Sequence, residues 1–95
     1  MQNNKEKNKA VEELYEIIAS LKTPADCELL FGDLCTVKEI EQMAQRIGAA
    51  KLLIDGKTYK EVTDVYDISS ATLSRVSRCV KYGEGYNTFL KEIEP

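Results

Sequence analysis

The part of the chain that most constrains its fold is a stretch in which two helix-start signals stand close together, residues 58–83. Thr58 followed by Glu61 has the Thr-x-x-Glu spacing of a capping box, which predicts a helix over residues 59–66. A second start signal follows almost at once, so only a tight turn separates this helix from the next. Helix, tight turn and helix together are typical of the helix-turn-helix motif.

The second helix of the pair is predicted over residues 71–82, after a turn at residues 67–68. The hydroxyls of Ser69 and Ser70 precede this helix and can accept hydrogen bonds from its free N–H groups. Gly83 is expected to end the helix in the left-handed conformation that is common at helix ends.

The two faces of this second helix carry different side chains. One face is an apolar stripe suited to a core, formed by Leu73, Val76 and Val80. The other face has hydroxyls and basic residues and no acid: Ser70, Thr72, Ser74, Arg75, Arg78 and Lys81. In helix-turn-helix proteins the second helix enters the DNA major groove, where arginine can bind guanine and serine or threonine can bond to bases or phosphates.

We therefore predict a DNA-binding surface on this helix and around it. The residues expected to approach bases are Ser69, Ser70, Thr72, Ser74 and Arg75. The residues expected to meet phosphates are Arg78, Lys81, Lys57 and Lys60. Residues 69–82 carry a net charge of +3 and the whole chain carries −3, so the rest of the chain carries −6 and would limit indiscriminate binding.

Two other interpretations of this pattern stay open. Amphipathic helix pairs are common in helical domains and a basic face is often only a solvated face. The alternative is therefore a helical protein-interaction module whose acidic body binds another protein. An enzyme is the least favoured class, because the chain has no histidine, no glycine-rich phosphate loop and no evident pair of catalytic carboxylates.

The composition favours one all-helical domain in the cytoplasm. A chain of 95 residues is too short for more than one domain, and only 2 prolines and 5 glycines interrupt its helical patterns. No run approaches the roughly 20 apolar residues of a membrane helix, and the polar N-terminus does not resemble a signal peptide. The cysteines (Cys27, Cys35 and Cys79) form no CxxC motif, so we expect free thiols and no metal site.

Four further helices are predicted from apolar periodicity and cap residues, over residues 9–21, 24–34, 37–54 and 86–93, with residues 1–8 as a frayed arm. Thr23 is expected to cap the second of these helices, with Pro24 at its first position. The last helix has one apolar edge, formed by Phe89, Leu90 and Ile93, and is expected to pack on the body or on a partner chain. Within this single domain, the dimerisation core, the helix-turn-helix head and the C-terminal helix would span residues 9–56, 58–83 and 86–95. Six short helices cannot easily cover so much apolar surface in a compact monomer, so we expect a homodimer. Two-fold symmetry would place its two recognition helices roughly 34 Å apart.

The longest predicted helix contains three small residues in a row, Gly48, Ala49 and Ala50. They either let another helix approach closely or mark a thin place in a core, and the sequence alone favours neither interpretation.

Several segments taken together resemble the tryptophan-repressor-related family, in particular its YerC/YecD type. The resemblance covers most of the chain and is strongest in LKTPADCELLFGDLCTVKEIEQMAQRIGAAKLLIDGKTYKEV and SSATLSRVSRCVKYG. It implies an all-helical, intertwined homodimer of TrpR-like chains with a helix-turn-helix head at each end. It also implies operator binding by a transcription regulator, with repression as the expected mode.

The resemblance also implies a place for a small effector. The tryptophan repressor binds L-tryptophan between core and head with two arginines, and the matching positions here are Arg46 and Arg75. The repressor has glycine after the second arginine, where this chain has Val76, and a β-branched side chain there would crowd an indole. We therefore expect Arg75 to serve DNA, or an ion pair with the core, more than a ligand, and we predict no obligatory cofactor.

A second departure from the family lies in the turn. Similar proteins usually have glycine at the position of Asp67, where the backbone often needs a positive φ. Aspartate tolerates left-handed geometry better than most residues. We therefore expect a slightly less stable head with the motif intact.

Overall fold

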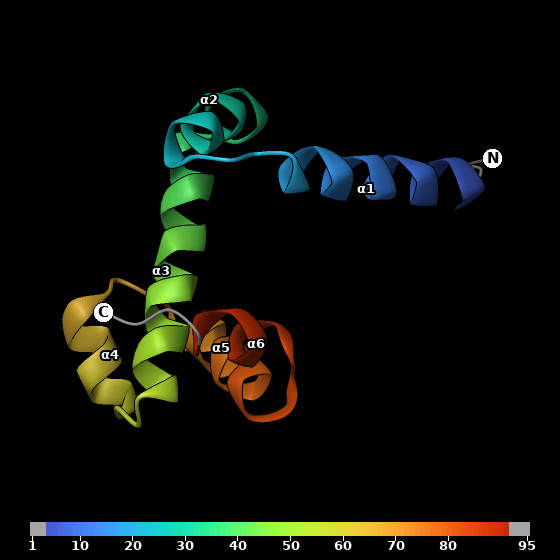
Figure 1. The fold of residues 1–95 in the computed structure, drawn as a ribbon. Helices are drawn as coiled ribbons and strands as arrows, with labels where there is room; N and C mark the ends of the chain where they lie inside the picture. Colours follow the sequence, from blue (N-terminus) through green and yellow to red (C-terminus); the bar gives the residue numbers. More distant parts are fainter. Residues whose placement is uncertain (1–3, 92–95) are drawn as a thin grey trace. The chain divides into compact units, whose positions relative to one another are not determined.

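The computed structural model describes residues 4–91 and shows an all-α chain, with no strand in that range (Figure 1). The helices are α1 (Asn4–Ala19), α2 (Pro24–Leu34), α3 (Val37–Ile54), α4 (Tyr59–Val65), α5 (Ser70–Tyr82) and α6 (Gly85–Leu90). The predicted all-α class with six helices is therefore confirmed. Contacts divide the chain into two compact units, residues 1–37 and residues 38–95.

The first unit contains α1 and α2, and α1 begins earlier than the sequence indicated. Residues 4–8, predicted as part of a frayed arm, are helical, while residues 1–3 lie outside the described residues. Lysine and glutamate have good helix propensity, so extending α1 towards the N-terminus costs little even without an apolar anchor. The helix also ends two residues sooner than predicted, at Ala19.

The start of α2 agrees with its predicted cap. Thr23 is extended, its hydroxyl accepts a hydrogen bond from the Asp26 N–H at 3.1 Å, and Pro24 occupies the first helical position. Neither α1 nor α2 buries any residue. Large apolar side chains of both helices are exposed, among them Tyr15 (65%) and Leu29 (76%), so this unit has an apolar surface that the structure leaves uncovered.

The second unit is built on the C-terminal part of α3, with α4 on one side and the α5–α6 pair on the other (Figure 1). Its buried core is small and consists of Ala49, Ala50, Val62, Leu73 and Val76. The predicted apolar stripe of α5 is thus confirmed, since Leu73 and Val76 are buried and Val80 packs against the core. On α3 the buried residues are the three small ones, which both interpretations of that segment predict. The ring of Tyr66 approaches the first of them closely.

Gly48 shows how close that approach is. A Cβ built on Gly48 would overlap the hydroxyl and the ring of Tyr66, the residue that ends α4. Only a glycine leaves room for this ring against α3. The contact therefore fixes the end of α4 on the long helix, directly before the turn of the helix-turn-helix.

Both helix-start signals of the head, which we define as residues 58–83, form as predicted. The Thr58 hydroxyl accepts from the Glu61 N–H at 3.1 Å, and the Glu61 carboxylate accepts from the Thr58 N–H at 3.1 Å. The Ser69 hydroxyl caps α5 by accepting from the Thr72 N–H at 3.1 Å. Each of these bonds satisfies an N–H group that a helix start leaves without a partner.

Two backbone predictions for the head are wrong. Gly83 is extended, with φ −93°, because its N–H bonds to the Cys79 carbonyl at 2.8 Å and the chain continues directly towards α6. Asp67 needs no left-handed geometry either, since no non-glycine residue within 4–91 has a positive φ. The expected cost at Asp67 therefore does not arise. The left-handed residue in this region is Gly56, with φ +87°, which follows the end of α3.

The C-terminal helix α6 packs back onto the body of the second unit, as one of the two predicted arrangements had it. Tyr86 and Leu90 pack against the buried core. The helix ends at Leu90, and the remaining predicted helical residues, 92–93, lie outside the described residues. None of the helices within residues 4–91 has the length and apolar content to span a membrane.

We predict that Gly48→Ala lowers the free energy of unfolding by about 1–3 kcal/mol, because the added methyl group must displace the Tyr66 ring from a packed site. Urea unfolding followed by circular dichroism measures this change.

The matched control is Gly32→Ala, because a Cβ at Gly32 meets nothing within 4 Å. Gly32 lies inside α2, where alanine is favoured over glycine by up to about 1 kcal/mol, so this variant should be neutral or more stable. Equal destabilisation by both variants would contradict the proposed role of the Gly48–Tyr66 contact.

Candidate functional site

The exposed face of α5 carries most of the residues predicted to contact DNA. Ser70, Ser74, Arg75, Arg78 and Lys81 are all exposed. The helix contains no acidic residue, and its three basic side chains form no ion pair within residues 4–91. These guanidinium and ammonium groups are therefore available to anionic partners.

The hydroxyls at the start of α5 are already engaged with each other. The Ser69 hydroxyl donates to the Thr72 hydroxyl at 2.9 Å, in addition to accepting from the Thr72 N–H. Both residues were predicted to approach bases. In the structure their visible role is to hold the first turn of the helix together, with Ser69 exposed and Thr72 half-buried.

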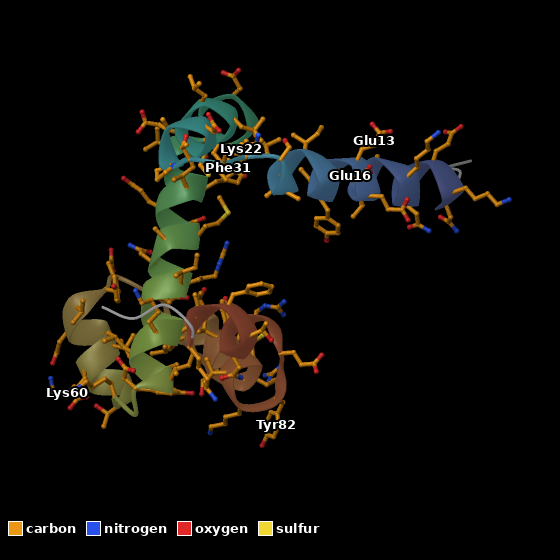
Figure 2. All side chains as sticks on the ribbon, viewed as in Figure 1. Glu13, Glu16, Lys22, Phe31, Lys60 and Tyr82 are labelled. Atoms are coloured by element: carbon orange, nitrogen blue, oxygen red, sulfur yellow. The ribbon has the colours of Figure 1, made fainter. Side chains whose placement is uncertain are left out.

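Two lysines outside α5 are also predicted to meet phosphates, and both are exposed, but their surroundings differ. Lys60 forms an ion pair with Asp64 at 3.2 Å, one helical turn along α4, and extends from the edge of the head (Figure 2). Both side chains of the pair are well exposed, at 83% and 62%, so the pair is weak and easily exchanged for another partner. Lys57 lies in the exposed connection before α4 and has no ion pair within residues 4–91.

A pocket of about 890 Å³ lies beside the same helix. Its lining comes from α3, α5, α6 and the connection after α5: Arg46, Ile47, Ala71, Thr72, Arg75, Val76, Cys79, Gly83, Gly85, Tyr86, Phe89 and Leu90. The structure thus brings Arg46 and Arg75 to one pocket, although they are far apart in the sequence. Ser70, Ser74, Arg78 and Lys81 do not line it.

The charged side chains of residues 4–91 that line this pocket have one sign. Two arginines of this range line it and no acidic side chain of the range does, while most of the other lining residues are apolar. The ion pair considered for Arg75 is not formed with any residue in the range 4–91. Such a lining suits a small molecule with an apolar body and an anionic group.

Val76 is part of the pocket wall, yet its side chain is only 1% exposed and belongs to the core. The pocket therefore remains open beside a β-branched residue. Arg75 is exposed and lines the pocket, so one side chain lies at the boundary between the basic face and the pocket.

One wall of this pocket was not predicted from the sequence. Tyr86, Phe89 and Leu90 of α6 line it, whereas the sequence pattern showed only that Phe89, Leu90 and Ile93 give this short helix one apolar edge. The glycines that flank Glu84 were the available signal, because they permit a sharp change of direction between α5 and α6. Within residues 4–91, no group of three or more His, Cys, Asp or Glu side chains is arranged to hold a metal ion, and all three cysteines are free thiols.

Comparisons with known proteins show which family shares this architecture. The family model described as Trp repressor protein matches residues 9–94. The uncharacterised protein YerC of Bacillus subtilis (strain 168) is 39% identical over 95 residues, which cover 99% of this chain and 91% of YerC.

Two solved structures are similar over nearly their whole length. A TrpR-like protein from Eubacterium eligens ATCC 27750 has a TM-score of 0.85 and 39% identity, covering 98% of this chain and 100% of that one. A crystal structure from Staphylococcus aureus, described as a candidate Trp repressor, has a TM-score of 0.84 and 37% identity, covering 96% and 92%. Because the family model spans nearly the whole chain and these relatives share more than a third of its residues, the chain belongs to the Trp repressor family.

Proposed function

We propose that this protein is a sequence-specific DNA-binding transcription regulator that acts as a homodimer and represses the genes it controls. The observation that carries the proposal is the exposed face of α5, the second helix of a helix-turn-helix, which holds no acid and three basic side chains that form no ion pair with the described residues 4–91. A surface of this kind attracts the DNA backbone and can enter the major groove. The chain also belongs to a family whose model is described as Trp repressor protein, which supports the same proposal.

The position of each residue on α5 suggests its role. Ser70 and Ser74 lie in the first turns of the helix, the part that meets base edges in this motif. Arg75 follows one residue later and has the reach to bind a guanine. Arg78 and Lys81 lie further along and meet phosphates, which supply affinity for any sequence.

A second copy of the chain is the proposed cover for the apolar surface of α1 and α2. Val11, Leu14, Ile17, Leu29 and Leu34 are each at least 36% exposed, and neither helix buries a residue. Exposed apolar side chains at this density are typical of an interface between subunits. A two-fold dimer would present two copies of α5 to successive turns of the operator.

A second proposed property is control by a small effector, and the pocket beside α5 is the observation that favours it. Its two arginines and apolar lining suit a carboxylate with an apolar body, the class to which L-tryptophan belongs. Because Arg75 both lines the pocket and borders the basic face, an occupant would act directly on the helix that contacts DNA. Adding L-tryptophan to an operator-binding assay tests this property.

The proposed function is tested by selecting fragments of a genomic library on the full-length protein at physiological salt and sequencing the bound fraction. We predict one enriched palindromic motif, and we predict that Arg75→Ala weakens binding to it by about 1–3 kcal/mol while random DNA is affected less. Absence of any enriched motif would contradict specific DNA binding. Equal losses on both DNAs would remove the base-reading role of Arg75 alone.

Lys81→Ala should act differently, because an ammonium group on a phosphate carries no sequence information. We predict a similar loss of affinity for operator and random DNA, with the slope of log K against log salt reduced by about one. Filter binding over a series of salt concentrations measures both quantities. Lys60→Ala is the comparison, and its effect should be smaller because Asp64 already offsets the charge of Lys60.

Dimer formation is tested by placing a charge on the exposed apolar surface of the first unit. We predict that Leu14→Asp, and separately Leu29→Asp, raises the dimer dissociation constant about tenfold or more, because a carboxylate would be buried without a partner. Sedimentation equilibrium measures the constant. Val65→Asp is the control, since Val65 is 64% exposed but lies on α4, and dissociation by this variant to the same degree would argue against an interface on α1 and α2.

A further inference from the structure

The side chain of Asn87 makes an unusual pair of contacts. Its Nδ2 atom donates to the Val80 carbonyl at 2.7 Å and to the Gly83 carbonyl at 3.2 Å. Val80 belongs to the last turn of α5, and Gly83 is the cap residue of that helix. One half-buried amide of α6 thus bonds to two carbonyls at the end of α5.

These bonds matter because α6 has little support of its own. It contains six residues, and its cap residue Glu84 provides no side-chain hydrogen bond. A helix of this length does not form in isolation, so it depends on tertiary contacts. The contacts it has are the apolar packing of Tyr86 and Leu90 on the core and the two hydrogen bonds of Asn87.

The same short helix forms one wall of the pocket. Gly85, Tyr86, Phe89 and Leu90 line the pocket, while Asn87 does not and is bonded to α5. The residues that would contact an occupant and the residue that holds the wall are therefore neighbours on one helix. Phe89 is 71% exposed, so burial of this ring does not hold the wall in place.

We propose that Asn87 is a positioning residue that holds α6 as a fixed wall of the pocket and thereby sets the affinity of the pocket for an apolar anion. The inference rests on the ligand-binding part of the proposed function. Without the two hydrogen bonds α6 separates from the end of α5 more often, and the pocket loses one side. The Arg46 and Arg75 guanidinium groups stay in place, so what is lost is the apolar part of the binding site.

The test uses the full-length protein and the fluorescent probe anilinonaphthalene sulfonate, which has an aromatic body and one negative charge. NMR shifts at the Ile47 and Thr72 amides identify binding in the pocket. Asn87→Ala should weaken this binding roughly tenfold and speed the hydrogen exchange of the α6 amides by a similar factor, as expected for the loss of two hydrogen bonds. Unchanged affinity and unchanged exchange would overturn the proposal, as would a wild-type protein that shows no saturable shift at these amides.

Thr58→Ala is the matched control. It removes the cap of α4, at a cost to stability of the same order as the loss of the Asn87 bonds, and Thr58 does not line the pocket. Its affinity for the probe should equal that of the wild type, because Thr58 does not line the pocket. If Thr58→Ala weakens binding of the probe as much as Asn87→Ala does, Asn87 acts only through the stability of the fold and the proposal fails.

Two further measurements keep the test decisive if Asn87→Ala folds poorly. Asn87→Asp keeps the shape of the side chain but removes its N–H donors. It should therefore weaken binding of the probe at least as much as Asn87→Ala does. In the wild type, the side-chain amide protons of Asn87 should exchange more slowly than those of the exposed Gln42. Equal exchange would overturn the proposal without any variant.

The outcome for Asn87 is separable from the outcome for DNA binding. With no effector present, Asn87→Ala should bind the selected operator about as well as the wild type, because the basic face of α5 is unchanged. A protein that selects no operator but responds to Asn87→Ala in the probe assay would refute DNA binding and keep the inference. If the wild type selects a specific operator and the Asn87→Ala variant binds the probe normally, DNA binding is kept and the inference about Asn87 is refuted.

Discussion

The close contact between Tyr66 and Gly48 is the constraint on which the rest of the second unit depends. A single missing Cβ on α3 makes room for an aromatic ring at the end of α4. The two alanines that follow Gly48 are fully buried and continue the same close packing. Because the turn begins directly after Tyr66, the position of this ring determines where α5 starts and which of its faces is left exposed.

The basic face and the pocket are consequences of how α5 then lies on the core. Leu73 and Val76 are turned inward, so the serines and basic residues of the other side face solvent. The edge between these two sides borders the pocket, and Arg75 lies on that edge. The proposed DNA-binding surface and the proposed site for an anion therefore lie on neighbouring strips of one helix, which would provide a direct physical route for regulation.

Local signals in the sequence were sufficient for most helix boundaries. Thr23 with Pro24, the capping box of Thr58 and the cap of Ser69 are interactions within a few residues, and each appears where it was predicted. Gly83 was assigned the wrong conformation because the sequence predicts the next helix but does not show how the chain turns between α5 and α6. The α6 wall and the Asn87 bonds were not foreseen, since they depend on how α6 folds back against α5. The pairing of Arg46 with Arg75 at one pocket came from family resemblance, because no sequence spacing connects residues on separate helices.

The hydrogen bond between the Ser69 and Thr72 hydroxyls has a consequence for the energetics of the proposed DNA association. Two hydroxyls that already bond to each other need not be reoriented when they enter a groove, so fewer side-chain rotamers are ordered on binding. The bond holds the first turn of α5 in one arrangement in the free protein. Association with DNA would then cost little conformational entropy at that turn.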